Sequence, residues 1–175
     1  MSLSFAEGVV KAYQTKWSLF NNFSVEIQFQ GSLKDKIGWN DEVGKNLEFY
    51  VTNMTTPQLT TNPIEEYIAD RYKFYNGKEN IYQFTITFKD FDQMSLYKMF
   101  SKAFVYQRSM YFDEIKSTVI VYKEPDYLNE SKSIIWTMEN TLISGVSALT
   151  FSNENASQIA EFSVDFKTNT LDVGK

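Results

Sequence analysis

The chain contains neither cysteine nor histidine among its 175 residues. Without cysteine there is no disulfide framework, no thiol catalysis and no Cys-ligated zinc or iron–sulfur cluster. Without histidine there is no Ser-His-Asp triad, no imidazole acid–base catalyst and little to hold a transition metal. Most enzyme classes are therefore excluded before any motif is considered, and we expect no enzymatic activity, no metal and no cofactor.

Proline and glycine are also scarce, at 3 and 7 residues, whereas 15 Phe, 11 Tyr and 3 Trp make the chain rich in aromatic side chains. This composition favours β-structure with well-packed faces. A length of 175 residues suits one domain with a core of its own, so we expect a single domain over residues 1–175. No run approaches the ~20 apolar residues of a membrane helix and no secretory signal is seen, which predicts folding in the cytosol without a membrane partner.

Basic residues are in the minority, with 17 Lys and Arg against 22 Asp and Glu, for a net charge of −5. Proteins that bind nucleic acid tightly gain their affinity by placing Lys and Arg against phosphates. The charge therefore argues against a protein that holds DNA or RNA.

Two segments show helical periodicity. Residues about 5–17 follow a capping-box spacing at Ser4 and Glu7 and repeat apolar side chains at helical intervals. Residues about 91–107 form the main predicted helix. Its core stripe consists of Leu96, Phe100 and Phe104.

Asp90 and Asp92 are the closest pair of carboxylates in the sequence. Such a pair can hold a hard metal ion or act as an acid and a base. The pair lies at a predicted helix start, however, where acidic side chains cap free N–H groups and interact favourably with the helix dipole. We therefore favour the capping role.

Three segments alternate apolar and polar residues, as strands with one buried and one wet face do: residues 23–30, 81–88 and 161–167. Asn76-Gly77 is a strong hairpin signal and predicts that residues 67–75 pair with 81–88. Less regular strands are predicted at residues 47–51, 115–122, 134–138 and 144–151.

Residues 31–46 hold three glycines among charged residues and predict a long surface loop, as do the polar residues 52–63. Trp39 lies in the first of these loops, whereas Trp17 and Trp136 fit core positions. An exposed Trp39, or Tyr residues on a sheet face, could stack a sugar, which leaves open a soluble β-sandwich carbohydrate-binding module. A hydrolase with paired carboxylates is less favoured because the acids are scattered.

The order of these segments resembles the tail tube proteins of contractile-tailed bacteriophages. Three parts of the chain carry the likeness: the passage from the first helix into a strand at 19–27, the hairpin and helix over 72–104, and the strands between 136 and 166. The likeness consists of segment order and hydrophobic pattern and includes no catalytic motif.

The resemblance implies an α+β, mainly β fold: a β-sandwich or half-barrel with one main helix and an N-terminal helix. Its strands would join a hexameric inner β-barrel, and the rings would stack into a hollow tail tube. The protein would be a structural virion component of the tail, assembled in the host cytoplasm. Its partners would be itself, tail sheath, baseplate and tape-measure proteins, with DNA only in passage during ejection. Tube body, baseplate initiator and tube terminator remain alternatives.

Polar strand faces could line such a channel, and acidic side chains there would repel the phosphates of passing DNA. The candidates are Glu26, Glu48, Glu139, Glu161 and Asp165. We expect Glu26, Glu161 and Asp165 to share the lumen, and residues 31–46 to make ring-to-ring contacts because loops project most easily along a tube axis.

Overall fold

The computed structural model describes residues 23–47, 50–59, 64–68, 71–75, 81–90, 94–109, 114–125, 131–149 and 159–174. The predicted helix over 5–17 lies outside these ranges, as do Trp17, Glu48 and Asp92. The described part is mainly antiparallel β-sheet with a few helices, which confirms the predicted mainly β class.

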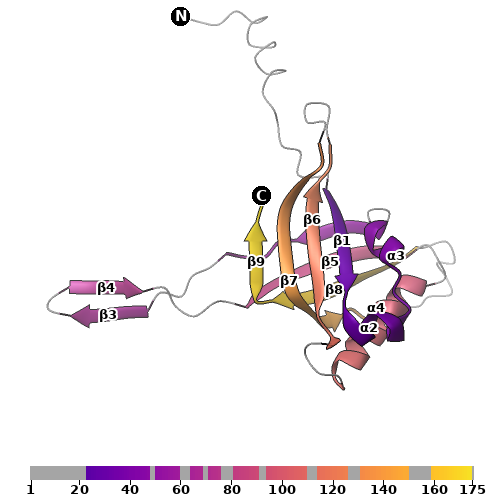
Figure 1. The fold of residues 1–175 in the computed structure, drawn as a ribbon, viewed down its shortest axis with the longest axis horizontal. Coiled ribbons are helices and arrows are strands. Elements are labelled where there is room, and N and C mark those ends of the chain that lie inside the picture. The colour runs from indigo at the N-terminus through magenta and orange to yellow at the C-terminus, as the bar shows by residue number, and fades with distance from the viewer. Residues whose placement is uncertain are drawn as a thin grey trace, which may run out of the picture.

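Seven strands form one antiparallel sheet in the order β1-β6-β7-β8-β5-β2, with β9 paired to β7 (Figure 1). Their bounds are β1 (Phe23–Phe29), β2 (Val51–Thr55), β5 (Tyr82–Asp90), β6 (Ser117–Lys123), β7 (Ser133–Val146), β8 (Ala160–Thr168) and β9 (Thr170–Val173).

β7 joins the two halves of this sheet. Its first part pairs with β6 and β9 and its last part with β8. Asn140 adopts φ 50° at the changeover, and the buried Ser117 hydroxyl donates 2.8 Å to the Thr141 carbonyl there. An irregularity of this kind bends a strand and lets a sheet curl. The two strands predicted at 134–138 and 144–151 are therefore one bent strand.

Helix α4 (Ser95–Gln107) supplies the centre of the core. The Phe100 ring packs against Phe29 of β1, Phe88 of β5 and Phe162 of β8, with ring centroids 5.0–6.2 Å apart. Leu96 and Phe100 are buried, and Phe104 is partly buried against the same core. The sheet thus curls around the apolar face of α4.

Asp90 caps α4 from the end of β5. Its Oδ2 accepts the Tyr97 backbone N–H at 2.9 Å, and the side chain is buried. The helix starts at Ser95 after Met94, which has φ 62°. Asp90 thus satisfies an N–H of the first helical turn as predicted, although the helix begins at Ser95 and not at 91, and its N-cap residue is Met94.

The predicted loop over 31–46 is wrong: the segment holds two short helices, α2 (Gly31–Ile37) and α3 (Asp41–Lys45). Leu33 and Ile37 lie one turn apart on α2 and are both buried. Gly38 ends α2 in the left-handed conformation, with φ 72°, which is the usual role of glycine after a helix. Because the segment belongs to the core, the expectation that it projects to stack rings is not retained.

The predicted pairing across Asn76-Gly77 is also wrong. β3 (Ile64–Ile68) pairs with β4 (Arg71–Tyr75), and this hairpin lies apart from the main sheet (Figure 1). β5 pairs instead with β8, because the apolar faces of both strands meet the same core. β2 begins within the predicted loop over 52–63, and β9 was not predicted.

Candidate functional site

Strands β5 and β8 present one apolar and one polar face. The apolar side chains are all buried in the core: Phe84, Ile86, Phe88, Phe162, Val164 and Phe166. The polar side chains between them reach the opposite face, where they are exposed or half-buried: Gln83, Thr85, Thr87, Lys89, Glu161, Ser163, Asp165 and Lys167. The strict alternation follows from the two-residue repeat of a strand.

The register between β5 and β8 places these polar side chains opposite one another in pairs. The Thr85 hydroxyl donates 2.7 Å to Asp165 Oδ1. The Thr87 and Ser163 hydroxyls lie 3.0 Å apart. Lys89 lies opposite Glu161, and Gln83 opposite Lys167. The face therefore combines hydroxyls with two acids and two lysines, so its own charge is balanced.

The four predicted acids that lie within the described residues do not gather at one place. Glu161 and Asp165 lie on the polar face of β8. Glu139 lies exposed on β7, opposite Thr170 of β9. Glu26 lies on β1, whose apolar side chains enter the same core from the other half of the curved sheet. Glu26 therefore lies on the outer side of the β1–β6 half of the sheet and the β8 pair on that of the β5–β8 half, and the lumen role of each stays a prediction.

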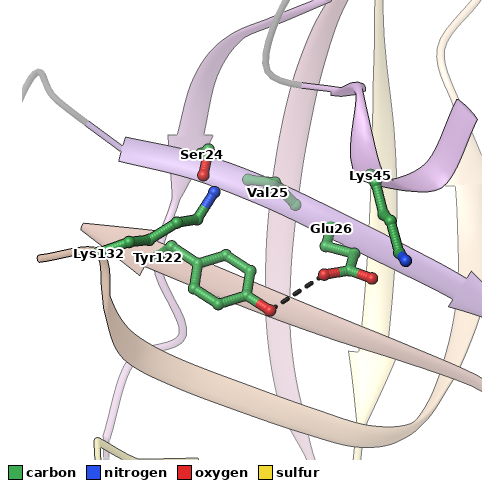
Figure 2. A pocket seen from close by; sticks show the side chains of 6 residues that line it. All are labelled: Ser24, Val25, Glu26, Lys45, Tyr122 and Lys132. Carbon is green, nitrogen blue, oxygen red and sulfur yellow. Dashed lines mark hydrogen bonds between the residues drawn. The ribbon is translucent and has the colours of Figure 1, made fainter. Parts of the chain in front are cut away.

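Glu26 borders a small open pocket on the β1–β6 half, together with Ser24, Val25, Lys45, Tyr122 and Lys132 (Figure 2). The Tyr122 hydroxyl donates 3.0 Å to Glu26 Oε2, and Gln28 Nε2 donates 2.8 Å to Glu26 Oε1. The pocket measures about 270 Å³, at the lower limit of the ~300–1,000 Å³ typical of small-molecule sites. Its size does not favour a sugar-binding role.

Lys132, which lines this pocket, contacts both Glu124 and Tyr122. Its Nζ lies 2.7 Å from Glu124 Oε1 and 4.5 Å from the centroid of the Tyr122 ring. Glu124 also accepts the Ser24 hydroxyl. Partial burial raises the pKa of Glu124, but the hydrogen bonds from Lys132 and Ser24 and the lysine charge outweigh it and lower this pKa below its ordinary value. Sequence analysis did not find this cluster, because Ser24 and Glu124 are 100 residues apart.

Tyr122 should titrate unusually late. Burial, the hydrogen bond to Glu26 and the Glu26 charge raise its pKa from 10.0 to about 12. Because the fold favours the neutral phenol, this contribution to stability is full below pH 10 and is lost as the pH rises toward 12. The difference between the phenolate absorbance titrations of the wild type and Tyr122→Phe should show this late step.

The Glu26→Gln variant tests whether Glu26 raises the pKa of Tyr122. It keeps an acceptor for the phenol but removes the charge, so the Tyr122 step should move toward lower pH. A step that stays in place would show that Glu26 does not control this tyrosine.

Trp39 is buried, at 4% exposure, and the prediction of an exposed stacking platform is wrong. Its indole Nε1 donates 3.2 Å to the Ile27 carbonyl, and its ring packs edge-on against Phe29 and Phe100. The tryptophan named for the carbohydrate-binding alternative is thus a core residue. Trp136 lies half-buried on β7.

The described ranges lack both a metal site and a membrane-spanning helix. No three acidic side chains there converge closely enough to hold a metal ion. No helix in the same ranges is long and apolar enough to span a membrane.

No protein-family model matches the chain, and no curated protein matches it. Solved structures do match. The anti-feeding prophage tube-terminating cap is 10% identical, with a TM-score of 0.59 over 91% of this chain and 93% of the other. A chain of the PVC sheath-tube complex, an extracellular contractile injection system in its extended state, is 12% identical, with a TM-score of 0.59 over 98% and 99%. A chain of the PVC sheath/tube terminator is 11% identical, with a TM-score of 0.58 over 90% and 96%.

These likenesses extend over nearly the whole of each chain. At 10–12% identity they establish a shared fold. The chain therefore has the fold of tube, cap and terminator components of contractile injection systems. The mainly β class with one main helix implied by the sequence resemblance is confirmed, and the sandwich or half-barrel and the hexameric inner barrel stay predictions.

Proposed function

We propose that this chain is a non-enzymatic structural subunit of a contractile tail. It assembles into six-membered rings that stack as a hollow tube or close its end. The polar face of β5 and β8 lines the channel, and DNA passes along it during ejection. The subunit acts in the virion tail after assembly in the host cytoplasm, with sheath, baseplate and tape-measure proteins as partners.

The observation that carries this proposal is the β5–β8 face itself. A sheet that is apolar on one side and continuously polar on the other is suited to a core behind it and water in front of it. The fold likeness supports the same role, since one further structure with this fold, at a TM-score of 0.54, is the anti-feeding prophage baseplate, described as 6-fold symmetrised.

The two ends of the main sheet differ in a way that favours directed ring closure. At one end, the outer edge of β1 is occupied: Trp39 bonds the Ile27 carbonyl, and a Cβ on Gly44 of α3 would lie 2.3 Å from that oxygen. At the other end, β2 pairs with β5 on one side, and no described element pairs with its outer side. Closing a ring would cover this edge, which otherwise invites aggregation.

The β2 edge can be tested at Thr52. This exposed residue lies at the register shift between β2 and β5, where it has no opposite residue on β5 and its hydroxyl donates 3.3 Å to the Thr87 carbonyl. Thr52→Pro should therefore leave the subunit folded but weaken strand addition at this edge, because proline removes a backbone N–H. Thr52→Ala is the control, since it loses the hydroxyl and keeps the N–H.

Solution mass and negative-stain microscopy of the purified proteins provide the measurement. The wild type and Thr52→Ala should form rings or tubes, and Thr52→Pro should remain mostly monomeric. A wild type that stays monomeric over the accessible concentration range would overturn the proposed function. Rings formed equally well by Thr52→Pro would overturn the role of the β2 edge alone.

A further inference from the structure

The β5–β8 face is widened by one strand on each side. β2 pairs with β5, and the last part of β7, residues 142–146, pairs with β8. β9 and β8 follow one another along one side of β7, whereas β6 occupies the other side only as far as Thr141. Among the described strands, none pairs with the other side of residues 142–146. β2 and this part of β7 are therefore the two edges of the sheet that presents the β5–β8 face.

The first edge contains a one-residue bulge in β2. The register with β5 shifts between Val51 and Asn53, so Thr52 is the extra residue. Val51 and Met54 both pack against the core, although they are three residues apart and not two. Thr52 is exposed, and its hydroxyl bonds the Thr87 carbonyl across the bulge. The extra residue thus bends β2 without turning its apolar side chains away from the core.

The opposite edge contains a matching bulge in β7. The register with β8 shifts between Ile143 and Gly145, so Ser144 is the extra residue, and it is exposed. Ile143 and Val146 pack against the core, again three residues apart. Gly145 lets the bulge lie close to β8, because a Cβ on it would stand 3.1 Å from Asp165 Oδ2. Both edges of the sheet therefore contain one extra residue at an exposed position.

Bulges on edge strands affect how copies of a sheet fit together. A bulge bends its strand and increases the local right-handed twist, and bulges are common at the rims of closed barrels. When strands close into a ring, their tilt, their stagger and their number must agree. A bulge changes the stagger by one residue, so a bulge on an edge strand acts directly on the fit between neighbouring copies.

We propose that the bulges at Thr52 and Ser144 determine how many copies of the chain close the ring. The ring itself comes from the proposed function, on which this role of the bulges rests. With both bulges in place, the edges of one copy meet those of the next at the tilt that a ring of one size requires. Without either bulge the β5–β8 face becomes flatter, and closure requires more copies.

A bulge can also serve only to protect an edge strand from unwanted pairing. Two features favour the role in ring size. The edge strand outside the β5–β8 face, β1, pairs with β6 in an unbroken register over Phe23–Phe29. Neither bulge is needed for the core, because a regular strand would also place the flanking apolar side chains on the core side.

Deletion of Thr52 or of Ser144 from the full-length chain is the test. Each deletion leaves a regular strand, so the subunit should fold with the strand content of the wild type by circular dichroism. Its rings should contain at least one more copy than wild-type rings, or open into spirals, as counted by native mass spectrometry and negative-stain class averages. Thr52→Ala and Ser144→Ala are the matched controls. They keep the extra residue, so their rings should have the wild-type number of copies.

Insertion of one glycine after Ser144 provides a second variant, which enlarges the bulge at an exposed position. It should change the ring in the opposite direction, to fewer copies, because it increases the bend of the edge strand. Every residue of the core is kept in this variant. It therefore tests the role of the β7 bulge independently of any loss of stability in the deletion variants.

Deletion and insertion variants whose rings all keep the wild-type number of copies would overturn the proposal. Faster association at an unchanged ring number would overturn it too, and would leave the bulges the role of protecting the edges. Alanine controls with an altered ring number would show that the side chains, and not the extra residues, are responsible. A wild type that remains monomeric would instead refute the proposed function, because no ring would exist to be sized.

Discussion

Replacement of Phe100 by Ala should lower the free energy of unfolding by ~3–5 kcal/mol, the usual cost of emptying a buried aromatic site. The Phe100 side chain is fully buried and links three strands that are distant in sequence, through Phe29, Phe88 and Phe162. Neighbouring residues cannot collapse onto the cavity without moving both halves of the sheet. Thermal unfolding followed by circular dichroism should show a fall in Tm of roughly 10 °C.

Lys102→Ala is the control, because Lys102 lies on the exposed side of the same helix. It should change stability by less than about 0.5 kcal/mol. Equal melting temperatures for Phe100→Ala and the wild type would show that the helix is not a core element and that its apolar stripe serves a contact between molecules.

Strand alternation was the part of the fold that could be predicted well. The segments over 23–30, 81–88 and 161–167 correspond closely to β1, β5 and β8. In the middle of these strands every second side chain is a buried Phe, Ile or Val, so the local pattern and the tertiary environment agree there. The main helix was predicted for the same reason, since Leu96 and Phe100 follow the helical repeat that faces the core.

The segment over 31–46 could not be predicted, because the partners that stabilise it are distant. Trp39 is held by the Ile27 carbonyl and by the rings of Phe29 and Phe100, none of which its local sequence indicates. Its glycines suggested a loop, yet Gly38 serves to end a helix and Gly44 permits close approach to β1. The same residue type thus marks both loops and tight packing.

The order of the strands in the sheet explains the remaining differences between the predicted and the observed strand pairing. Asn76-Gly77 indicated a local hairpin, but β5 pairs with β8, about 80 residues farther along the chain. Local turn signals carry no information about such pairing. For the candidate site, alternation alone places Glu161 and Asp165 together on one face, whereas the position of Lys89 opposite Glu161 depends on the strand register and required the structure.

Glu161→Lys/Asp165→Lys should convert the proposed channel into one that retains DNA. Both side chains are exposed on β8, so their replacement should leave the core and tube formation largely intact. The loss of the Thr85–Asp165 hydrogen bond and the approach of a new lysine to Lys89 should each cost less than about 1 kcal/mol at exposed positions. Because both substitutions repeat in every subunit, the balanced charge of this face would become strongly positive around the whole lumen.

Retention of DNA by purified tubes, measured as a function of salt, is the readout. Each lysine that meets a phosphate should add about −0.9 to the slope of log K against log salt for duplex DNA, so retention should be strong at low salt and disappear at high salt. Glu26→Lys is the matched control, because Glu26 lies on the outward face of the β1–β6 half and its reversal should leave DNA passage unchanged. Double-variant tubes that release DNA freely at low salt would show that the β5–β8 face does not line the channel. Retention by Glu26→Lys tubes instead would place the β1–β6 face there.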